Sequence, residues 1–304
     1  MSVIENTLKR LQGQRAAAAV PAQPAEPAFV APPAAGAAAR RLASGDAPAP
    51  ERVIAIDQHA LRAAGMLPPA HQEHELAQEY RRIKRPLINS ALGRGVAPLA
   101  HGNLIMVTSA VPAEGKTFMS LNLAFSMRLE EDVTVLLVDG DVVNPRISQI
   151  LGVENEQGLL DLIKDPGLAI GSAILPTDVP GLSFLPAGRQ DANATELLAS
   201  ARMQAVMSQL GSADPARLVL FDSAPLLVTT ESQALAHSAG QVLVVVRADQ
   251  TQQHVLLDAL DTLDEGKPVS LVLNQSLRPS SGYYYQYGGS ARPREHGERP
   301  LEAR

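Results

Sequence analysis

The triplet Gly115-Lys116-Thr117 follows an apolar, β-prone run at 104–107 and precedes a helix-compatible segment that starts at Phe118. Strand, tight loop, Gly-Lys-Thr and helix form the layout of a phosphate-binding loop. Backbone N–H groups at the start of that helix would converge on an anion, and the helix dipole favours negative charge there. In such a loop the lysine reaches the β- and γ-phosphates, and the threonine hydroxyl holds Mg²⁺. The sequence therefore predicts a nucleotide site.

The loop departs from the usual G-x-x-x-x-G-K-[ST] pattern because Ala110 stands where the first glycine belongs. A surface turn that happens to carry Gly-Lys-Thr is the alternative, and the flanking strand and helix argue against it. The residues expected to bind the nucleotide are Ala110, Val111, Pro112, Ala113, Glu114, Gly115, Lys116, Thr117, Phe118 and Asn274.

Apolar runs alternate with helical patterns along the rest of the chain. Strands are expected at 104–107, 133–138, 182–185, 218–221, 242–246 and 269–273, and helices at 195–210 and about 252–264. Near-continuous apolar strands separated by helices indicate an α/β fold, a mostly parallel sheet with helices on both faces.

Acidic residues follow two of these strands directly. Asp139 and Asp141 come after 133–138, and Asp222 comes after 218–221. Ligands of open α/β sheets bind at the carboxyl ends of the strands. An aspartate is also common at the start of a turn, but an apolar strand that ends in Asp is what a Mg²⁺-organising Walker B motif needs.

Bulk composition restricts the function further. The chain has 304 residues, a formal net charge of −6 and no cysteine, which excludes disulfides and thiol chemistry and argues against a broad nucleic-acid surface. No apolar run approaches the roughly 18–20 residues that span a bilayer, and the start lacks a secretory pattern. We expect a cytoplasmic location and no nucleic-acid partner.

Composition also divides the chain. Residues 1–15 form a short amphipathic segment. In residues 16–50, 23 of the 35 residues are alanine or proline, which is typical of a linker. A globular domain is expected at 51–276, with a short strand or turn and a brief helix between 52 and 66. Residues 277–304 read as a disordered tail.

A charged helix is expected to begin near His74 and to end before Pro86, giving a helix at 74–86 within the domain. Glu79, Arg82 and Arg85 are spaced to lie along one side of it. A solvated face with intrahelical ion pairs is the alternative to an interface there.

The tail holds four of the five tyrosines, Tyr283, Tyr284, Tyr285 and Tyr287. Core packing does not explain aromatic residues in such a segment. They are either a sticky, partner-stacking tail or phosphate acceptors on an arm that extends into a nucleotide site.

Together these features resemble the bacterial tyrosine kinase (BY-kinase) family, a P-loop type of kinase. The resemblance covers roughly 79–287 and rests on VTSAVPAEGKT as Walker A, VLLVDGD as the second aspartate motif, LVLFD as Walker B, and the tyrosine tail. The start of the chain, the linker and EYRRIKRPLI are most similar to autokinases of exosortase-associated exopolysaccharide clusters.

The resemblance implies an ATP-dependent tyrosine autokinase that regulates exopolysaccharide synthesis or export. Lys116, Asp139 and Asp141 would be catalytic, with Asp139 as the base, and Thr117, Asp141 and Asp222 would hold Mg²⁺. The E-x-x-R-x-x-R motif formed by Glu79, Arg82 and Arg85 would mediate a ring-like homo-oligomer, in which one subunit's tail enters its neighbour's site. Further implied partners are a membrane chain-length regulator, which would recruit the chain to the inner membrane face, and a tyrosine phosphatase.

Two other hypotheses remain open at this stage. A positioning ATPase of the partition or division-site type shares the fold, but it typically carries a second lysine early in the loop, and residues 107–114 contain none. A non-catalytic, nucleotide-sensing scaffold is favoured by Ala110 and Ala113, which replace frequent glycines. The lack of a basic residue directly after Asp141 is a further departure from the family's pattern.

Overall fold

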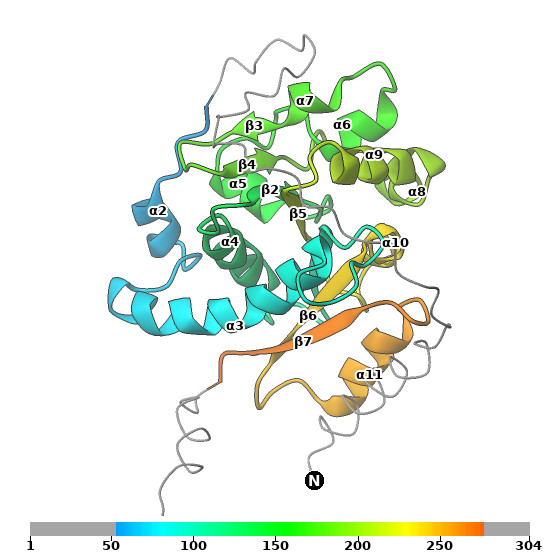
Figure 1. The fold of residues 1–304 in the computed structure, drawn as a ribbon. Coiled ribbons are helices and arrows are strands. Elements are labelled where there is room, and N and C mark those ends of the chain that lie inside the picture. Colours follow the sequence, from blue (N-terminus) through cyan, green and yellow to red (C-terminus); the bar gives the residue numbers. More distant parts are fainter. Residues whose placement is uncertain (1–52, 277–304) are drawn as a thin grey trace, which may run out of the picture.

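The strands form one seven-stranded sheet in the order β3-β4-β2-β5-β1-β6-β7 (Figure 1). The computed structural model describes residues 53–276. All neighbouring strands of this sheet pair in parallel except β3, which is antiparallel to β4. The strands are β1 (Leu104–Ser109), β2 (Thr134–Asp139), β3 (Leu175–Pro176), β4 (Leu182–Leu185), β5 (Arg217–Asp222), β6 (Gln241–Arg247) and β7 (Val269–Asn274). The predicted α/β fold with a mostly parallel sheet is confirmed.

Strand β1 lies inside the sheet between β5 and β6, and all six of its residues are buried. Its neighbours are in a register that aligns their carboxyl ends. Asp222 of β5 pairs with Val107 of β1 on one side and with Asp139 of β2 on the other. The loop after β1 therefore starts next to both acidic strand ends.

Helices cover both faces of the sheet. Residues of α3 and α4 share one hydrophobic core with Ile105 and Val107, and residues of α6 and α8 to α11 share the other with Leu104 and Met106. The helices are α2 (Gln58–Ala63), the short 3₁₀ helix η1 (Ala70–Gln72), α3 (Glu73–Leu92), α4 (Lys116–Met127), α5 (Arg146–Ile150), α6 (Leu159–Lys164), α7 (Ile170–Ala173), α8 (Ala194–Leu198), α9 (Ala201–Ser212), α10 (Thr230–Ser238) and α11 (Gln253–Asp261).

The sequence pattern predicted that the helix at 74–86 would end before Pro86. This prediction is wrong, because α3 continues through the proline. It runs on to Leu92 and ends at Gly93, which has φ 68°. Proline inside a helix costs about 3 kcal/mol. Leu87 and Ile88, directly after the proline, are only 2% and 3% exposed. Burying two such side chains contributes about 1.5–3 kcal/mol each, which offsets that cost.

The prediction of a single helix at 195–210 is also wrong, because α8 and α9 are separate helices. Ser200 lies between them in an extended conformation, with φ −78° and ψ 156°. Its hydroxyl accepts a hydrogen bond from the Met203 N–H at 3.2 Å. Ser200 is therefore an N-cap, and the preference of serine for that position breaks the helix.

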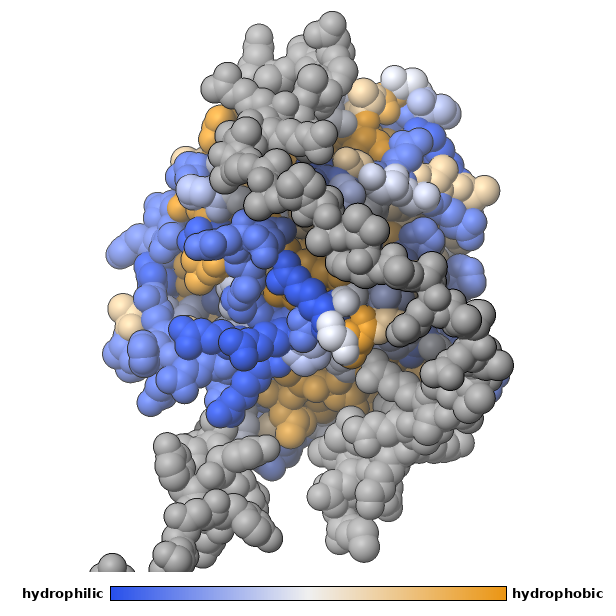
Figure 2. Space-filling model, viewed as in Figure 1, coloured by the Kyte–Doolittle hydropathy of each residue, from blue (hydrophilic) through white to orange (hydrophobic). Residues whose placement is uncertain are grey.

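The amphipathic start, the Ala/Pro-rich linker and the tyrosine tail lie outside the described residues, so the expectations for them remain predictions. Within residues 53–276, no helix combines the length and apolarity needed to cross a bilayer. Figure 2 shows hydrophilic side chains over α3 and hydrophobic surface in the region of β7, where Leu273 is 56% exposed.

Candidate nucleotide-binding site

The phosphate-binding loop forms where the sequence places it, between β1 and α4. Gly115 caps α4 with φ 93°, a left-handed conformation that disfavours other residues. A Cβ on Gly115 would lie 2.1 Å from Nδ2 of Asn274, at the end of β7. The turn therefore requires glycine here, and a side chain at this position would also displace the Asn274 amide. The first-turn amides of α4 have no intrahelical acceptor and can bind an anion.

Lys116, the first residue of α4, forms an ion pair with Asp141. Its Nζ lies 3.1 Å from Oδ2 of Asp141, and both side chains are largely buried. Oδ1 of Asp141 accepts the Asn144 N–H at 3.1 Å, which fixes the carboxylate. The pair holds the ammonium at the mouth of the loop, where phosphate oxygens would be bound.

Asp222 lies at the end of β5, beneath the start of α4. Its Oδ1 accepts the Ser120 hydroxyl at 3.0 Å, whereas its buried Oδ2 has no hydrogen-bond partner in the described part of the chain. Burial raises the pKa of Asp222 to about 6, although the Lys116 charge and the Thr117 and Ser120 hydroxyls oppose the rise. A buried oxygen without a partner is destabilising, so a cation near it would be stabilised.

Asp139, at the end of β2, is fully buried and bound to α5. Its Oδ2 accepts both the N–H and the hydroxyl of Ser148 at 2.8 Å, and its Oδ1 has no partner within residues 53–276. Burial, reinforced by the charges of Asp222 and Asp141, raises the pKa of Asp139 to about 7. This carboxylate is therefore far more basic than an exposed aspartate and exchanges a proton near neutral pH.

Gly140 allows the three aspartates to gather. Its N–H donates to the Asp222 carbonyl at 2.7 Å, and a Cβ at Gly140 would lie 2.8 Å from that same oxygen. A larger residue would separate the ends of β2 and β5. Sequence reasoning did not assign a role to Gly140, Ser120 or Ser148. Ser120 could have been found from its position one helical turn after Lys116, but nothing in the sequence marks Ser148.

The residues present fit a magnesium ion that is bound together with a nucleotide. Among residues 53–276, no group of three or more acidic or histidine side chains is arranged to hold a metal by itself. Mg²⁺ commonly takes one or two protein ligands and completes its shell with waters and phosphate oxygens. The unpartnered oxygen of Asp222 beside Thr117 provides such a position. When bound, the ion neutralises charge on the β- and γ-phosphates.

The predicted nucleotide-binding residues make different contacts in the structure. The Val111 N–H already donates to the Glu114 carboxylate at 2.9 Å, and Pro112 has no N–H. Asn274 donates from Nδ2 to the Glu114 carbonyl at 2.8 Å. Phe118 lines a hollow of about 500 Å³ with Leu67 and other residues from α2 to α3.

The two alanines that replace glycines have different backbones. Ala113 has φ 67°, whereas Ala110 is buried and has no positive φ. A left-handed alanine costs about 1–2 kcal/mol. We expect Ala113→Gly to raise the free energy of unfolding by about 1 kcal/mol. The matched change Ala110→Gly should lower it by about 0.5–1 kcal/mol. Urea denaturation measures both, and an equal loss for the two variants would contradict the strain at Ala113.

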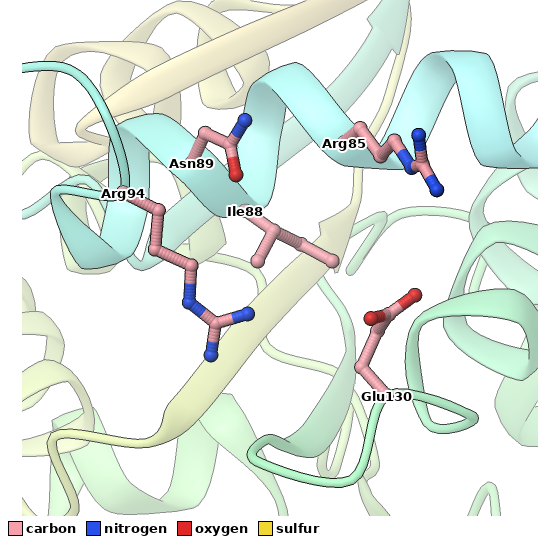
Figure 3. Close-up of a pocket in the computed structure, with 5 residues that line it drawn as sticks. All are labelled: Arg85, Ile88, Asn89, Arg94 and Glu130. Atoms are coloured by element: carbon pink, nitrogen blue, oxygen red, sulfur yellow. The ribbon is translucent and has the colours of Figure 1, made fainter.

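The charged residues predicted for oligomerisation lie on α3, away from the nucleotide site. Arg82 donates to Glu79 at 3.3 Å within the helix. Arg85 lines a hollow of about 300 Å³ with Ile88, Asn89, Arg94 and Glu130 (Figure 3). Glu130 follows the carboxyl end of α4, so this hollow is at the end of α4 opposite the phosphate loop.

Relatives of this chain are named as tyrosine-protein kinases, some of them putative. It is 30% identical over 211 residues to the tyrosine-protein kinase ptk of Acinetobacter johnsonii, and the match covers 69% of this chain and 28% of that protein. It is 28% identical over 187 residues to the putative tyrosine-protein kinase CapB of Staphylococcus aureus, covering 60% of this chain and 80% of that protein. The chain thus spans little more than a quarter of the Acinetobacter kinase.

Among solved structures, the kinase domain of the Escherichia coli tyrosine kinase ETK matches with a TM-score of 0.58 and 24% identity, covering 69% of this chain and 80% of that one. This likeness shows a shared fold. No protein-family model matches the chain. With a phosphate loop that faces aspartates from two strands, a fold shared with ETK and relatives that are named tyrosine kinases, this chain fits the bacterial tyrosine kinase (BY-kinase) family.

Proposed function

We propose that this protein is an ATP-dependent tyrosine autokinase that phosphorylates its own carboxy-terminal tyrosines. The observation that supports it best is the pairing of Lys116 with Asp141 at the mouth of the phosphate loop, 3.1 Å apart, beside Asp222. This arrangement provides one cation for the phosphates and acidic oxygens for a magnesium ion. The naming of relatives as tyrosine kinases supports tyrosine as the acceptor.

In this proposal each residue acts mainly by position and charge. Phosphoryl transfer passes through a loose transition state, so charge stabilisation and alignment matter more than removal of a proton. Lys116 would neutralise the β- and γ-phosphate oxygens, and Thr117, Asp141 and Asp222 would bind Mg²⁺ and its waters. Asp139 would accept the proton of the tyrosine hydroxyl through Oδ1, which Ser148 leaves unbound. This oxygen is buried, so the hydroxyl would reach it only after the site opens.

The four tail tyrosines are the proposed acceptors, and the fifth tyrosine supports this by exclusion. Tyr80, in α3, is only 6% exposed, and burial raises its pKa well above the usual value. A buried phenol cannot enter a nucleotide site unless α3 detaches from the core. The remaining tyrosines are Tyr283, Tyr284, Tyr285 and Tyr287.

Incubation of the purified full chain with Mg-ATP, followed by a phosphotyrosine blot, tests the proposal. Replacing all four tail tyrosines with phenylalanine should remove at least about nine-tenths of the signal, because those residues are the acceptors. Tyr80→Phe is the matched control and should keep the wild-type signal. A signal that survives in the four-fold variant would refute the tail as the acceptor. No signal from wild type, even with a membrane partner's cytoplasmic segment present, would refute the kinase.

The proposed cellular role is regulation of exopolysaccharide synthesis or export. It includes a ring-like homo-oligomer through Glu79, Arg82 and Arg85, recruitment to the inner membrane face by a membrane chain-length regulator, and reversal by a tyrosine phosphatase. Arg82 and Arg85 lie on the exposed side of α3, which is compatible with a contact to another subunit. Phosphate groups on the tail would add negative charge and favour its release.

A further inference from the structure

Glu114 is an acidic residue inside the phosphate loop, yet it is only 1% exposed. Its Oε2 accepts the Val111 N–H at 2.9 Å, which closes the loop on itself across Pro112 and Ala113. Its Oε1 accepts the Arg247 N–H at 3.3 Å and the hydroxyl of Thr251. The carboxylate is therefore turned into the protein and satisfied there by three donors.

Two of these donors come from the segment that joins β6 to α11. Arg247 ends β6, and Thr251 lies two residues before the start of α11. The segment is itself ordered, since the Thr251 N–H donates to the Arg247 carbonyl at 3.1 Å and the Ala248 N–H donates to the Asn274 carbonyl at 2.9 Å. Asn274 in turn donates to the backbone carbonyl of Glu114 at 2.8 Å. The loop is thus braced against the ends of both β6 and β7.

This brace determines the shape of the loop where phosphate would bind. The bond from Val111 to Glu114 holds the chain reversal in which Ala113 has φ 67°. Amides that bind phosphate must already be oriented, because ordering them on binding would reduce affinity. A buried carboxylate that loses one donor must also carry an uncompensated desolvation cost, so the loop would relax.

We propose that Glu114 is a positioning residue of the nucleotide site. It fixes the phosphate loop through Val111 and makes nucleotide affinity depend on Thr251, a residue of the β6–α11 segment that is not part of the loop. The inference rests on the nucleotide-binding part of the proposed function, and it does not require tyrosine to be the acceptor.

The test measures binding of Mg-ADP and Mg-ATP to the full chain by isothermal titration calorimetry at 20 °C. Thr251→Val keeps the side-chain shape and removes the hydroxyl, and we expect the Kd to rise about tenfold. Glu114→Gln exchanges one acceptor oxygen for a donor, and we expect a similar rise. The double variant should be at most about threefold weaker than the weaker single variant, because both changes break the same contact.

Two matched variants separate positioning from general destabilisation. Thr251→Ser restores the hydroxyl and should bind within about twofold of wild type. Thr134→Val removes a threonine hydroxyl at the exposed start of β2, at the opposite end of the sheet, and should leave Kd unchanged. Melting temperatures are recorded for all variants, so that any loss of folded protein is measured separately.

The inference is overturned if Thr251→Val and Glu114→Gln both bind within twofold of wild type, even when their melting temperatures fall. It is also overturned if Thr251→Ser binds as weakly as Thr251→Val, or if wild type binds neither nucleotide. A wild type that binds nucleotide but yields no phosphotyrosine refutes the proposed kinase activity alone.

Discussion

Replacement of Lys116 by methionine should reduce autophosphorylation at least about a hundredfold, the size of effect seen when one preorganised charge-stabilising group is lost. The Lys116 ammonium is the cation that the structure places at the mouth of the loop, 3.1 Å from Asp141. Methionine has a similar length and no charge, so the transferred phosphoryl group would lose its protein cation. A time course of phosphotyrosine formation in Mg-ATP measures the change in rate.

The same substitution should also destabilise the fold, which provides an independent check. Removing one partner of a buried ion pair leaves the other uncompensated and costs about 3 kcal/mol or more. The variant K116M should therefore unfold at lower urea concentration at pH 8, whereas the double variant K116M/D141N should recover most of that loss without recovering activity. Lys164→Met, which removes a surface lysine paired with Asp191, should keep both activity and stability. Full activity in K116M would contradict the role of Lys116.

The contribution of Asp139 and Asp222 to the stability of the nucleotide-free protein, measured in a chelator, should fall as pH rises from about 4 to 7. Asp139 and Asp222 have ordinary pKa values near 3.8, and burial raises these pKa values to about 7 and about 6 in the folded chain. In that window the folded state binds protons that the unfolded state has released, so raising the pH favours unfolding. Below about pH 4 both states are protonated, and the penalty disappears.

Asp139→Asn should remove most of this pH dependence and stabilise the protein at pH 8, on the order of 4 kcal/mol for a pKa shift of this size. The asparagine oxygen can still accept the Ser148 donors, so the local contacts survive. Urea denaturation at pH 5 and pH 8, with Glu265→Gln as an exposed control, measures the effect. An unchanged pH profile in the Asp139 variant would show that this carboxylate is not the titrating group.

The sequence predicted those parts of the site that depend on local order along the chain. An apolar strand, Gly115-Lys116-Thr117 and a following helix are the context that a phosphate loop requires, and the parallel sheet brings Asp139 and Asp222 to the same edge. The register that pairs Asp139 with Asp222 follows from that topology. The strands lie where the apolar runs do, because burial on both faces of the sheet demands apolar residues throughout.

Features that depend on distant contacts were not predicted. Helix α3 continues past Pro86 because Leu87 and Ile88 are buried against the core. A prediction from the proline alone does not account for that burial. The partners of Asp139 and Glu114, Ser148 and Thr251, are ordinary polar residues until the fold places them. The raised pKa values arise from burial, which the sequence pattern alone does not quantify.

The position of Asn274 against Gly115 has a consequence for how the tail could be used. The last strand ends beside the phosphate loop, and Tyr283 follows Asn274 by nine positions. Nine residues span at most about 30 Å when fully extended. In the proposed function, an acceptor separated from the loop by so few residues would have a high effective concentration near its own nucleotide as well as near a neighbour's. If the proposed autokinase forms a ring, self-modification within one subunit and exchange between subunits would therefore be in direct kinetic competition, and the spacing between subunits would decide which is faster.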